Sequence, residues 1–341
     1  MYIQSAVIGI PQFLELAQTL PIIDVRSPGE YRRGHIPGAV NIPLFNDEER
    51  AAVGTIYVQT GRNEAILQGL EFTGKKMRAL CEEVLALNSG QMLVYCWRGG
   101  MRSHSMAWLF ETVGRQCLVL EGGYKTFRRA VLDEMAVPRE LRVLSGYTGS
   151  GKTEILAELK KIGHQVIDLE GLAHNRGSAF GALGQPPQPS VEQFENLFFA
   201  ELHKTDKKQP LWLEDESINI GKVQITPVFY DQMKRAKTLQ VLVPQSIRVQ
   251  RLLREYGGFD RALLAESIKK VEKRLGYEKC KQALELCAAG DLAQVAKMLL
   301  DYYDKAYEFQ ISARAPETVT RLDVSDGVNV TEIAKQLSET V

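Results

Sequence analysis

The stretch LRVLSGYTGSGKTEILAEL at residues 141–159 decides the fold of the second half of the chain. Residues 141–145 predict a buried strand, residues 146–153 fit the pattern GxxxxGK[ST] position by position, and residues 154–159 predict a helix. This order of strand, loop and helix is the context in which the pattern forms a phosphate-binding P-loop. Backbone amides in such a loop wrap a phosphate chain, and the positive end of the helix dipole favours the anion. The predicted phosphate-binding residues are Gly146, Gly149, Ser150, Gly151, Lys152 and Thr153, of which Thr153 can ligate Mg²⁺.

Acidic and polar residues after neighbouring strands predict a second part of this site. Hydrolysis of a nucleotide usually needs an acid at the end of a second strand, and Glu214 or Asp215 supplies one. Residues 164–170 predict a strand that ends in two acids, and residues 171–181 predict a binding loop, from which we select Asp168, Arg176 and Ser178. The P-loop serves a nucleotide or any other diphosphate, including that of an activated alkyl donor.

A second chemical site is predicted at YCWRGGMRS, residues 95–103. An apolar run at 92–94 precedes it and a helical pattern at 106–110 follows, so Cys96 lies where a buried strand becomes a helix. Backbone amides and the helix dipole favour a thiolate at such a corner, and Arg98 and Arg102 add positive charge. Asp24 leaves another strand at the same expected sheet edge, where it either braces the Cys96 loop or forms a surface salt bridge.

Helical and turn patterns fill the rest of the chain. Residues 63–88 predict a helix broken near Gly74, residues 27–29 a turn, and residues 282–309 a helical pair broken at 289–291. Residues 233–281 hold thirteen Lys or Arg against five Asp or Glu. Among these, Arg248, Arg251 and Arg254 share a helix and predict a lid over phosphates or a stripe for a nucleic-acid backbone.

Length and composition limit the class of protein. The 341 residues suffice for two domains, and 42 basic residues balance 42 acidic ones. Five scattered cysteines without a CxxC pair predict neither a disulfide framework nor a zinc site, which fits a cytoplasmic location. Neither a leader at residues 1–5 nor a membrane span is expected. With a boundary at Pro138, we predict an α/β chain with a parallel-sheet domain at 1–136 and a P-loop α/β domain with helical additions at 137–341.

The N-terminal segments resemble a rhodanese domain. The resemblance rests on IIDVR at 22–26, EYRRGHIPGAVNIP at 30–43 and the Cys96 loop, and so covers about the first 105 residues. It implies a rhodanese-like fold and a cysteine that carries sulfur or selenium as a persulfide or selenosulfide. Rhodaneses usually place the loop arginine five residues after the cysteine, whereas Arg102 follows Cys96 by six, as in the related cell-cycle dual-specificity phosphatases.

The order of a rhodanese-like half and a P-loop half, with DLEGLAH at 168–174 and EDES at 214–217, resembles the bacterial tRNA 2-selenouridine synthases. The resemblance implies two steps on wobble 2-thiouridine in tRNA. Geranyl diphosphate first alkylates the sulfur, and selenium from selenophosphate then replaces it. It also implies a selenophosphate synthase as selenium supplier and no tightly bound cofactor.

Two other functions fit the same residues. One is a phosphatase with Cys96 as nucleophile, Arg102 as phosphate ligand and a nucleotide-binding regulatory domain. The other is a rhodanese-type sulfurtransferase coupled to an ATPase that activates tRNA by adenylation. Release of phosphate from a generic phosphoester would favour the first, and ATP consumption matched to product would favour the second.

Overall fold

The computed structural model describes residues 5–324 and 329–339. Residues 1–4, on which most of the expected absence of a leader rests, lie outside the described residues. The chain divides into two compact units, Met1–Glu134 and Met135–Val341. Within the described ranges, no helix has both the length and the apolar character that a membrane crossing requires.

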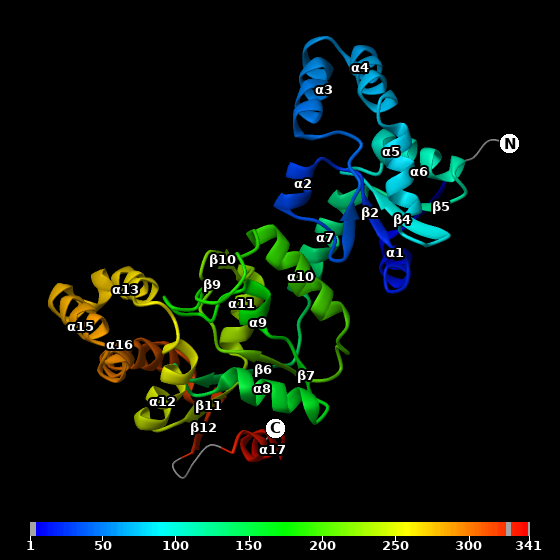
Figure 1. Ribbon diagram of the computed structural model, residues 1–341. Helices are drawn as coiled ribbons and strands as arrows, with labels where there is room; N and C mark the ends of the chain where they lie inside the picture. Colours follow the sequence, from blue (N-terminus) through cyan, green and yellow to red (C-terminus); the bar gives the residue numbers. More distant parts are fainter. Residues whose placement is uncertain (1–4, 325–328, 340–341) are drawn as a thin grey trace. The chain divides into compact units, whose positions relative to one another are not determined.

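The N-terminal unit is built on a five-stranded sheet in which every pairing is parallel. Its strands lie in the order β1-β5-β4-β2-β3, so β4 lies in the middle (Figure 1). In β4 four successive residues are fully buried, as expected for a parallel strand covered on both faces. The bounds of the strands are β1 Ala6–Ile8, β2 Ile22–Asp24, β3 Ala39–Asn41, β4 Gln91–Tyr95 and β5 Gln116–Leu120.

Helices α1 to α7 accompany this sheet. The helix predicted at 63–88 is present as α4 and α5, with the break just after Gly74. The predicted turn at 27–29 is wrong, because Ser27 caps helix α2 by accepting from the Glu30 amide. The bounds are α1 Ile10–Leu16, α2 Pro28–Arg33, α3 Asp47–Gln59, α4 Arg62–Gly74, α5 Met77–Leu85, α6 Met101–Thr112 and α7 Gly123–Ala136.

The C-terminal unit holds a second parallel five-stranded sheet, in the order β12-β11-β6-β8-β7. The strand before the P-loop, β6, lies in the centre between β8 and β11. After β6 the chain crosses to the β8 side of the sheet, and it later returns to form β11 on the other side of β6. The carboxyl end of β6 is therefore a topological switch point, the place where open α/β sheets bind ligands. The bounds are β6 Leu141–Gly146, β7 Gln165–Val166, β8 Leu211–Glu214, β11 Lys237–Leu242 and β12 Val319–Asp323, with a separate antiparallel pair β9 Asn219–Ile220 and β10 Val223–Gln224.

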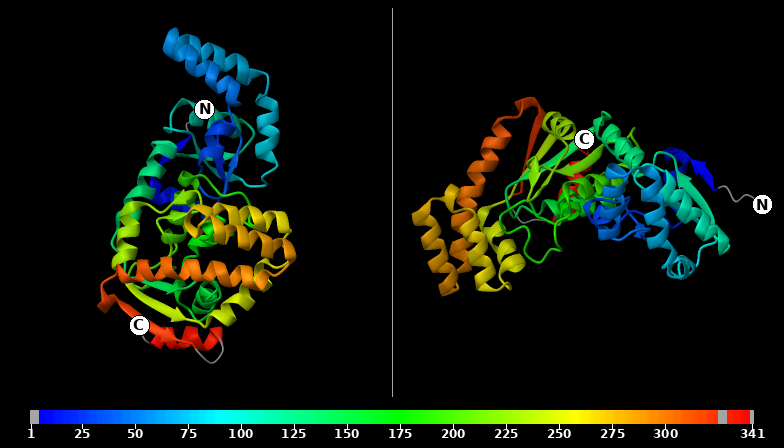
Figure 2. Two further views of the ribbon diagram at one scale, coloured as in Figure 1. Left: turned by 90° about the vertical axis from the view of Figure 1, so that its left-hand side faces the viewer. Right: turned by 90° about the horizontal axis from the view of Figure 1, so that it is seen from above.

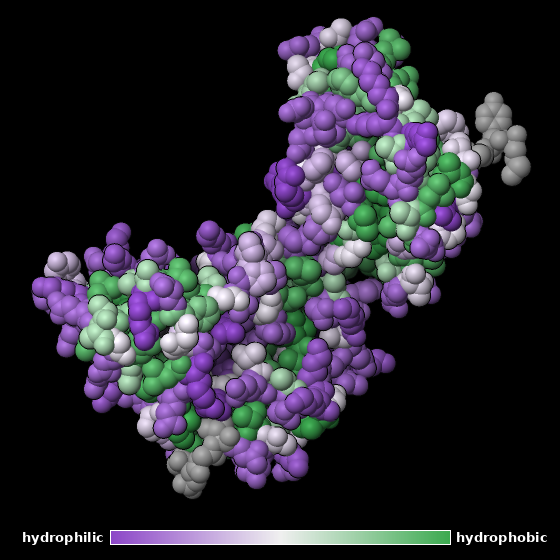
Figure 3. Space-filling model, in the orientation of Figure 1, coloured by the Kyte–Doolittle hydropathy of each residue, from purple (hydrophilic) through white to green (hydrophobic). Residues whose placement is uncertain are grey.

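Helices surround this sheet and extend it on one side. The predicted helical pair at 282–309 is present as α15 and α16, which form with α13 and α14 a helical addition around its own apolar core. The long helix α16 runs alongside the other helices of the addition in the left view of Figure 2. Figure 3 shows hydrophilic side chains interspersed with hydrophobic ones over these helices. The bounds are α8 Lys152–Lys161, α9 Leu169–Ala173, α10 Val191–His203, α11 Pro227–Arg235, α12 Gln245–Tyr256, α13 Arg261–Lys270, α14 Glu272–Leu275, α15 Tyr277–Ala289, α16 Leu292–Ser312 and α17 Val330–Glu339, with a 3₁₀ turn at Pro316–Thr318.

Candidate functional sites

Cys96 lies directly after the central strand β4, where the chain turns into α6. The side chain is only 3% exposed and packs in the apolar core with Val94 and Met106. Its sulfur donates a hydrogen bond to Ser103 Oγ at 3.4 Å, and the Ser103 hydroxyl donates to the carbonyl of Gly100 at 2.9 Å. The predicted corner between strand and helix is therefore present, but the thiol is turned into the core under the loop.

The Cys96 loop packs backbone to backbone against the turn between β5 and α7. Gly99 has φ +61°, and a Cβ there would lie 2.5 Å from the carbonyl oxygen of Leu120. Gly123 has φ +60°, and a Cβ there would lie 2.3 Å from the carbonyl oxygen of Cys96. The same carbonyl accepts from the Tyr124 amide at 2.8 Å. Two glycines far apart in the sequence thus fix the loop, because any side chain would separate the two backbones.

The two loop arginines have different surroundings. Arg102 forms an ion pair with Glu30 at 2.8 Å and a second hydrogen bond at 3.3 Å. Burial raises the pKa of Glu30, but the hydrogen bond and charge of Arg102 outweigh it, so the pKa is lowered overall. Arg98 is exposed. The Arg102 guanidinium, expected beside the sulfur, therefore pairs with the Glu30 carboxylate instead. An anion bound in the loop would compete with Glu30 for this guanidinium.

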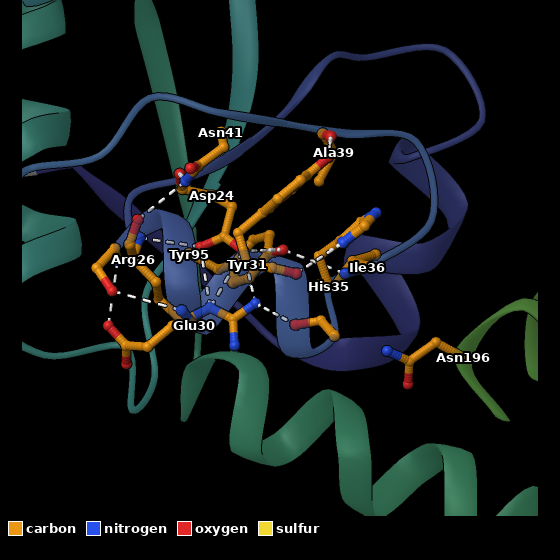
Figure 4. A network of polar contacts seen from close by, with 12 residues as sticks. Asp24, Arg26, Glu30, Tyr31, His35, Ile36, Ala39, Asn41, Tyr95 and Asn196 are labelled. Atoms are coloured by element: carbon orange, nitrogen blue, oxygen red, sulfur yellow. Dashed lines mark hydrogen bonds and ion pairs between the residues drawn. The ribbon is translucent and has the colours of Figure 1, made fainter. Parts of the chain in front are cut away.

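Asp24 is the centre of a buried network at the end of β2 (Figure 4). Its carboxylate forms an ion pair with Arg26 at 2.6 Å and accepts from the Tyr95 hydroxyl at 2.7 Å. The Arg26 guanidinium also lies 3.8 Å from the centre of the Tyr124 ring. The expectation of a surface salt bridge is wrong, since Asp24 and Arg26 are 0% and 1% exposed. Asp24 contacts the residue before Cys96, so it acts on the strand that carries the cysteine.

The P-loop has the geometry that its sequence predicts. Gly149 and Gly151 have φ +80° and +82°, and Gly151 caps α8. Two buried polar atoms beside the loop, Ser150 Oγ and Arg251 Nη1, have no hydrogen-bond partner among the described residues. Arg251 lies against the loop, because a Cβ on Gly151 would come within 1.6 Å of its Nη1. Buried polar groups are rarely left unpaired, so these donors fit an anionic ligand.

Lys152 is buried at the base of this loop. Its ammonium donates to the carbonyl of Gly146 at 3.1 Å and lies 5.3 Å from the centre of the Tyr307 ring. Burial lowers the pKa of Lys152, but Tyr307, Glu170 and Glu216 more than offset this, so the pKa is raised overall. Lys152 therefore stays charged and supplies a fixed positive point to a phosphate.

The two carboxylates that act most strongly on this lysine are Glu170 and Glu216, and Asp215, one of the two candidates from the sequence, acts on it more weakly. Burial raises the pKa of Glu216 well above its usual range, and the charge of nearby Glu170 raises it further. Glu170 also accepts a long hydrogen bond of 3.5 Å from Thr153 Oγ1. A proton on one of the two carboxyl groups, or a cation bound between them, removes the repulsion between such close acids. By contrast, buried Glu214 accepts from the Leu169 amide at 3.0 Å.

Asp215 and Asp168 each have a partner within the fold. Asp215 pairs with Arg314 at 2.6 Å. Asp168 caps α9 by accepting from the Gly171 amide at 2.7 Å, so the strand predicted at 164–170 ends earlier than expected. In residues 5–324 and 329–339, no three His, Cys, Asp or Glu side chains are placed to hold a metal by themselves. Thr153, Glu170 and Glu216 nevertheless fit Mg²⁺, which typically takes one or two carboxylates and completes its shell with phosphate oxygens and water.

A cavity of about 470 Å³ opens over the P-loop. Besides residues of the P-loop itself, four residues selected from the sequence line it: Arg176, Ser178, Arg251 and Arg254. Arg176 also forms an ion pair with Glu255. These positions favour a lid over phosphates for Arg251 and Arg254. Arg248, by contrast, is 4% exposed and pairs with Asp304 at 2.7 Å, so it cannot belong to an exposed stripe for nucleic acid.

Sequence reasoning missed five residues of these sites. They are Ser103, Gly123, Glu170, Glu216 and Tyr307. Glu170 and Glu216 are each the last acid of a short acidic segment, at residues 168–170 and 214–216. The sequence does not show which acid of each segment faces the P-loop. Tyr307 comes from α16, far along the chain, and gave no local signal.

These features define the class of protein: a rhodanese-like domain joined to a P-loop α/β domain. The family model of the rhodanese-like domain matches residues 11–130. The model of the tRNA 2-selenouridine synthase AAA domain matches residues 139–339, which is more than half of the chain. The chain therefore belongs to the tRNA 2-selenouridine synthase family, whose name denotes a tRNA-modifying enzyme.

Solved structures that are similar to parts of the chain include the following three. The N-terminal domain of a "putative ATP/GTP binding protein" from Clostridium difficile 630 is 41% identical over 37% of this chain and 99% of its own, with a TM-score of 0.34. A rhodanese-related protein from Thermoplasma volcanium is 18% identical over 37% and 92%, with a TM-score of 0.25. The full-length tRNA isopentenylpyrophosphate transferase from Bacillus halodurans is 15% identical over 59% and 96%, with a TM-score of 0.33.

Proposed function

We propose that this protein converts wobble 2-thiouridine of tRNA to 2-selenouridine in two steps, S-geranylation by geranyl diphosphate and selenium transfer from selenophosphate. The observation that carries the proposal is the cavity over the P-loop in a domain of this family. It holds a buried lysine and two donors, Ser150 Oγ and Arg251 Nη1, that find no partner in the described part of the chain. The cavity thus presents positive charge and free hydrogen-bond donors to a diphosphate.

In the first step the sulfur of 2-thiouridine attacks C1 of geranyl diphosphate. The C–S bond forms, the C–O bond breaks, diphosphate leaves, and the base loses its N3 proton to water. Negative charge grows on the leaving oxygens, where the loop amides, Lys152 and the guanidinium of Arg251 can stabilise it. Mg²⁺ held by Thr153, Glu170 and Glu216 would neutralise further charge on the diphosphate.

In the second step selenium from selenophosphate attacks C2 of the alkylated base. The C–Se bond forms, the C–S bond breaks, and geranyl thiol leaves, after which hydrolysis of the Se–P bond gives phosphate. Alkylation prepares this step because an alkylated sulfur is the better leaving group. On the strength of the rhodanese resemblance, we assign to Cys96 the binding of the selenium donor in its loop for this attack, with no bond formed to the sulfur. The buried position of the sulfur requires the loop at 97–100 to open first.

The test for the first step is Lys152→Ala, with mass spectrometry of the nucleosides of a 2-thiouridine tRNA as readout. Geranylated nucleoside should fall strongly, because the fixed charge beneath the diphosphate is lost. Lys161→Ala, on the exposed side of the same helix, is the matched control and should geranylate normally. Normal prenyl transfer by Lys152→Ala would remove the P-loop from this step.

The test for the second step is Cys96→Ser in the same assay. Selenated nucleoside should disappear while geranylated nucleoside accumulates, since the first step does not use the thiol. Cys81→Ser, a partly buried thiol of the same unit, serves as control and should selenate normally. Normal selenation by Cys96→Ser would end the assignment of selenium handling to this residue.

The partners follow from these reactions. The expected co-substrates are geranyl diphosphate and selenophosphate, with a selenophosphate synthase as supplier and a tRNA bearing wobble 2-thiouridine as acceptor. A cytoplasmic location fits such a tRNA. Of the predicted arginine series, Arg251 and Arg254 line the cavity. Arg251 is proposed to contact phosphate, and Arg254 to contact tRNA or phosphate.

A further inference from the structure

An apolar pocket adjoins the phosphate-binding cavity. It lies between α12, α13, α15 and α16, and its exposed lining is almost entirely apolar. The two cavities share four lining residues: Thr148, Ser178, Leu252 and Tyr256. The two cavities are therefore neighbours, and this pocket lies within reach of a ligand whose phosphates lie on the P-loop.

The lining of the pocket indicates what kind of group it takes. Aliphatic side chains from α16, among them Val295, Leu299 and Leu300, form one wall, and the rings of Phe180, Tyr256 and Tyr303 form others. A ribose or a nucleobase needs several convergent polar groups for its hydroxyls and ring nitrogens. The chemistry of the lining fits a hydrocarbon instead.

We propose that this pocket binds the distal isoprene unit of the prenyl diphosphate whose phosphates lie on the P-loop. The identity of the ligand as a prenyl diphosphate rests on the proposed function, whereas the placement of its chain rests on the two adjoining cavities. The reacting C1 then lies at their junction, between the phosphate cradle and the hydrocarbon pocket.

The size of the pocket agrees with one isoprene unit. Its volume is about 70 Å³. At roughly 10–15 Å³ for each atom-sized position, this volume holds about five to seven heavy atoms. One five-carbon isoprene unit fits this space. A ten-carbon geranyl chain would place its distal unit in the pocket and leave the unit that carries C1 at the mouth of the pocket.

Binding of a ligand series to the full chain tests the placement. Inorganic pyrophosphate, dimethylallyl diphosphate and geranyl diphosphate share the phosphates and differ in chain length. Each fully buried methylene strengthens binding about fourfold. The five additional carbons of geranyl diphosphate should therefore make it bind on the order of 1,000-fold tighter than dimethylallyl diphosphate. Equal affinities for the two prenyl diphosphates, measured by isothermal titration calorimetry, would overturn the placement.

Two matched variants on α16 locate the effect. Ala296 lines the pocket, so Ala296→Trp should fill it and reduce the preference for geranyl over dimethylallyl diphosphate to less than about fivefold. Unchanged pyrophosphate binding by this variant shows that its P-loop is intact. Ala293 is exposed on the same helix, and Ala293→Trp should keep the full preference. A full preference in Ala296→Trp, or an equal loss of preference in both variants, would refute the proposal.

A prenyl-transfer assay separates this inference from the proposed function. If the wild-type chain alkylates 2-thiouridine with no preference for chain length, the pocket assignment fails and the function stands. If it binds geranyl diphosphate with the expected preference but never alkylates the base, the function fails and the hydrocarbon pocket stands.

Discussion

Replacing Asp24 by asparagine should destabilise the N-terminal unit strongly. The change leaves the Arg26 guanidinium buried at 1% exposure without its counter-charge. The new side chain could keep its oxygen toward the Arg26 Nε, but its amide group would then face two donors, Arg26 Nη2 and the Tyr95 hydroxyl. Breaking a buried ion pair typically costs about 3–5 kcal/mol, and solvent screening does not reduce the cost at this depth. We therefore expect the free energy of unfolding of this unit to fall by about that amount.

The assay is hydrogen exchange with mass spectrometry on the full chain. Peptides that cover β2 and β4 report the opening free energy of the N-terminal unit alone, so unfolding of the other unit does not interfere. Glu82→Gln is the matched control: it neutralises one partner of an ion pair in the same unit, with Arg78 at 2.8 Å, where the two side chains are 60% and 92% exposed. Such a pair contributes only about 0.3–0.5 kcal/mol.

The two variants also separate a structural role of Asp24 from a chemical one. If Asp24 positions β4 and hence Cys96, loss of selenation should follow the loss of stability and recover when temperature is lowered. An opening free energy for Asp24→Asn within about 0.5 kcal/mol of that for Glu82→Gln would refute the reasoning. Loss of activity with unchanged stability would return Asp24 to a direct role in the chemistry of the loop.

Three further predictions follow from the charges and thiols of the structure. Glu30→Gln removes the counter-charge of Arg102. The pKa of Glu30 is lower in the folded state than in the unfolded state. The ion pair therefore stabilises the fold at pH values above the unfolded pKa of Glu30, and this stabilisation is lost as the pH falls through the folded pKa. The variant should therefore be about 1 kcal/mol less stable at pH 7 and equal to wild type in acid, as measured by urea unfolding; a difference independent of pH would contradict this. Burial raises the pKa of Cys117 to about 12, so about one molecule in 10⁴ carries its thiolate at pH 8, and peptide mapping should find it unalkylated by iodoacetamide unless denaturant is added. Glu216→Gln should remove most of the gain in Tm that Mg²⁺ gives wild type in the presence of pyrophosphate; an equal gain in both proteins would exclude Glu216 as a ligand.

Local chemistry explains why much of the architecture could be predicted. The P-loop pattern needs only neighbouring residues, since glycines with positive φ, a lysine and a helix start are encoded within eight positions. Hydrophobic periodicity and helix-breaking residues also predict the break after Gly74 and the helical pair joined at residues 289–291. The signal at Ser27 was ambiguous, because serine before proline begins both turns and helices.

The orientation of side chains and the ion pairs between distant elements could not be predicted from local sequence patterns. The sequence placed Arg102 six residues after Cys96, but only packing brought Glu30 from another element onto its guanidinium. Likewise, helical spacing put Arg248 and Arg251 on one helix, whereas its packing against the P-loop and α16 buried Arg248 on Asp304 and left Arg251 over the phosphate cavity.

The sequence by itself determined that two glycine-rich loops lead from buried strands into helices, because each loop depends on a few consecutive residues whose backbone conformation and charge act locally. Only the tertiary structure decided that Cys96 faces the core, that the charges of Glu216 and Glu170 act on Lys152, and that an apolar pocket adjoins the cavity over the P-loop. These features depend on side chains brought together from distant helices and strands, and the energy of burial and charge pairing is defined only once those elements pack.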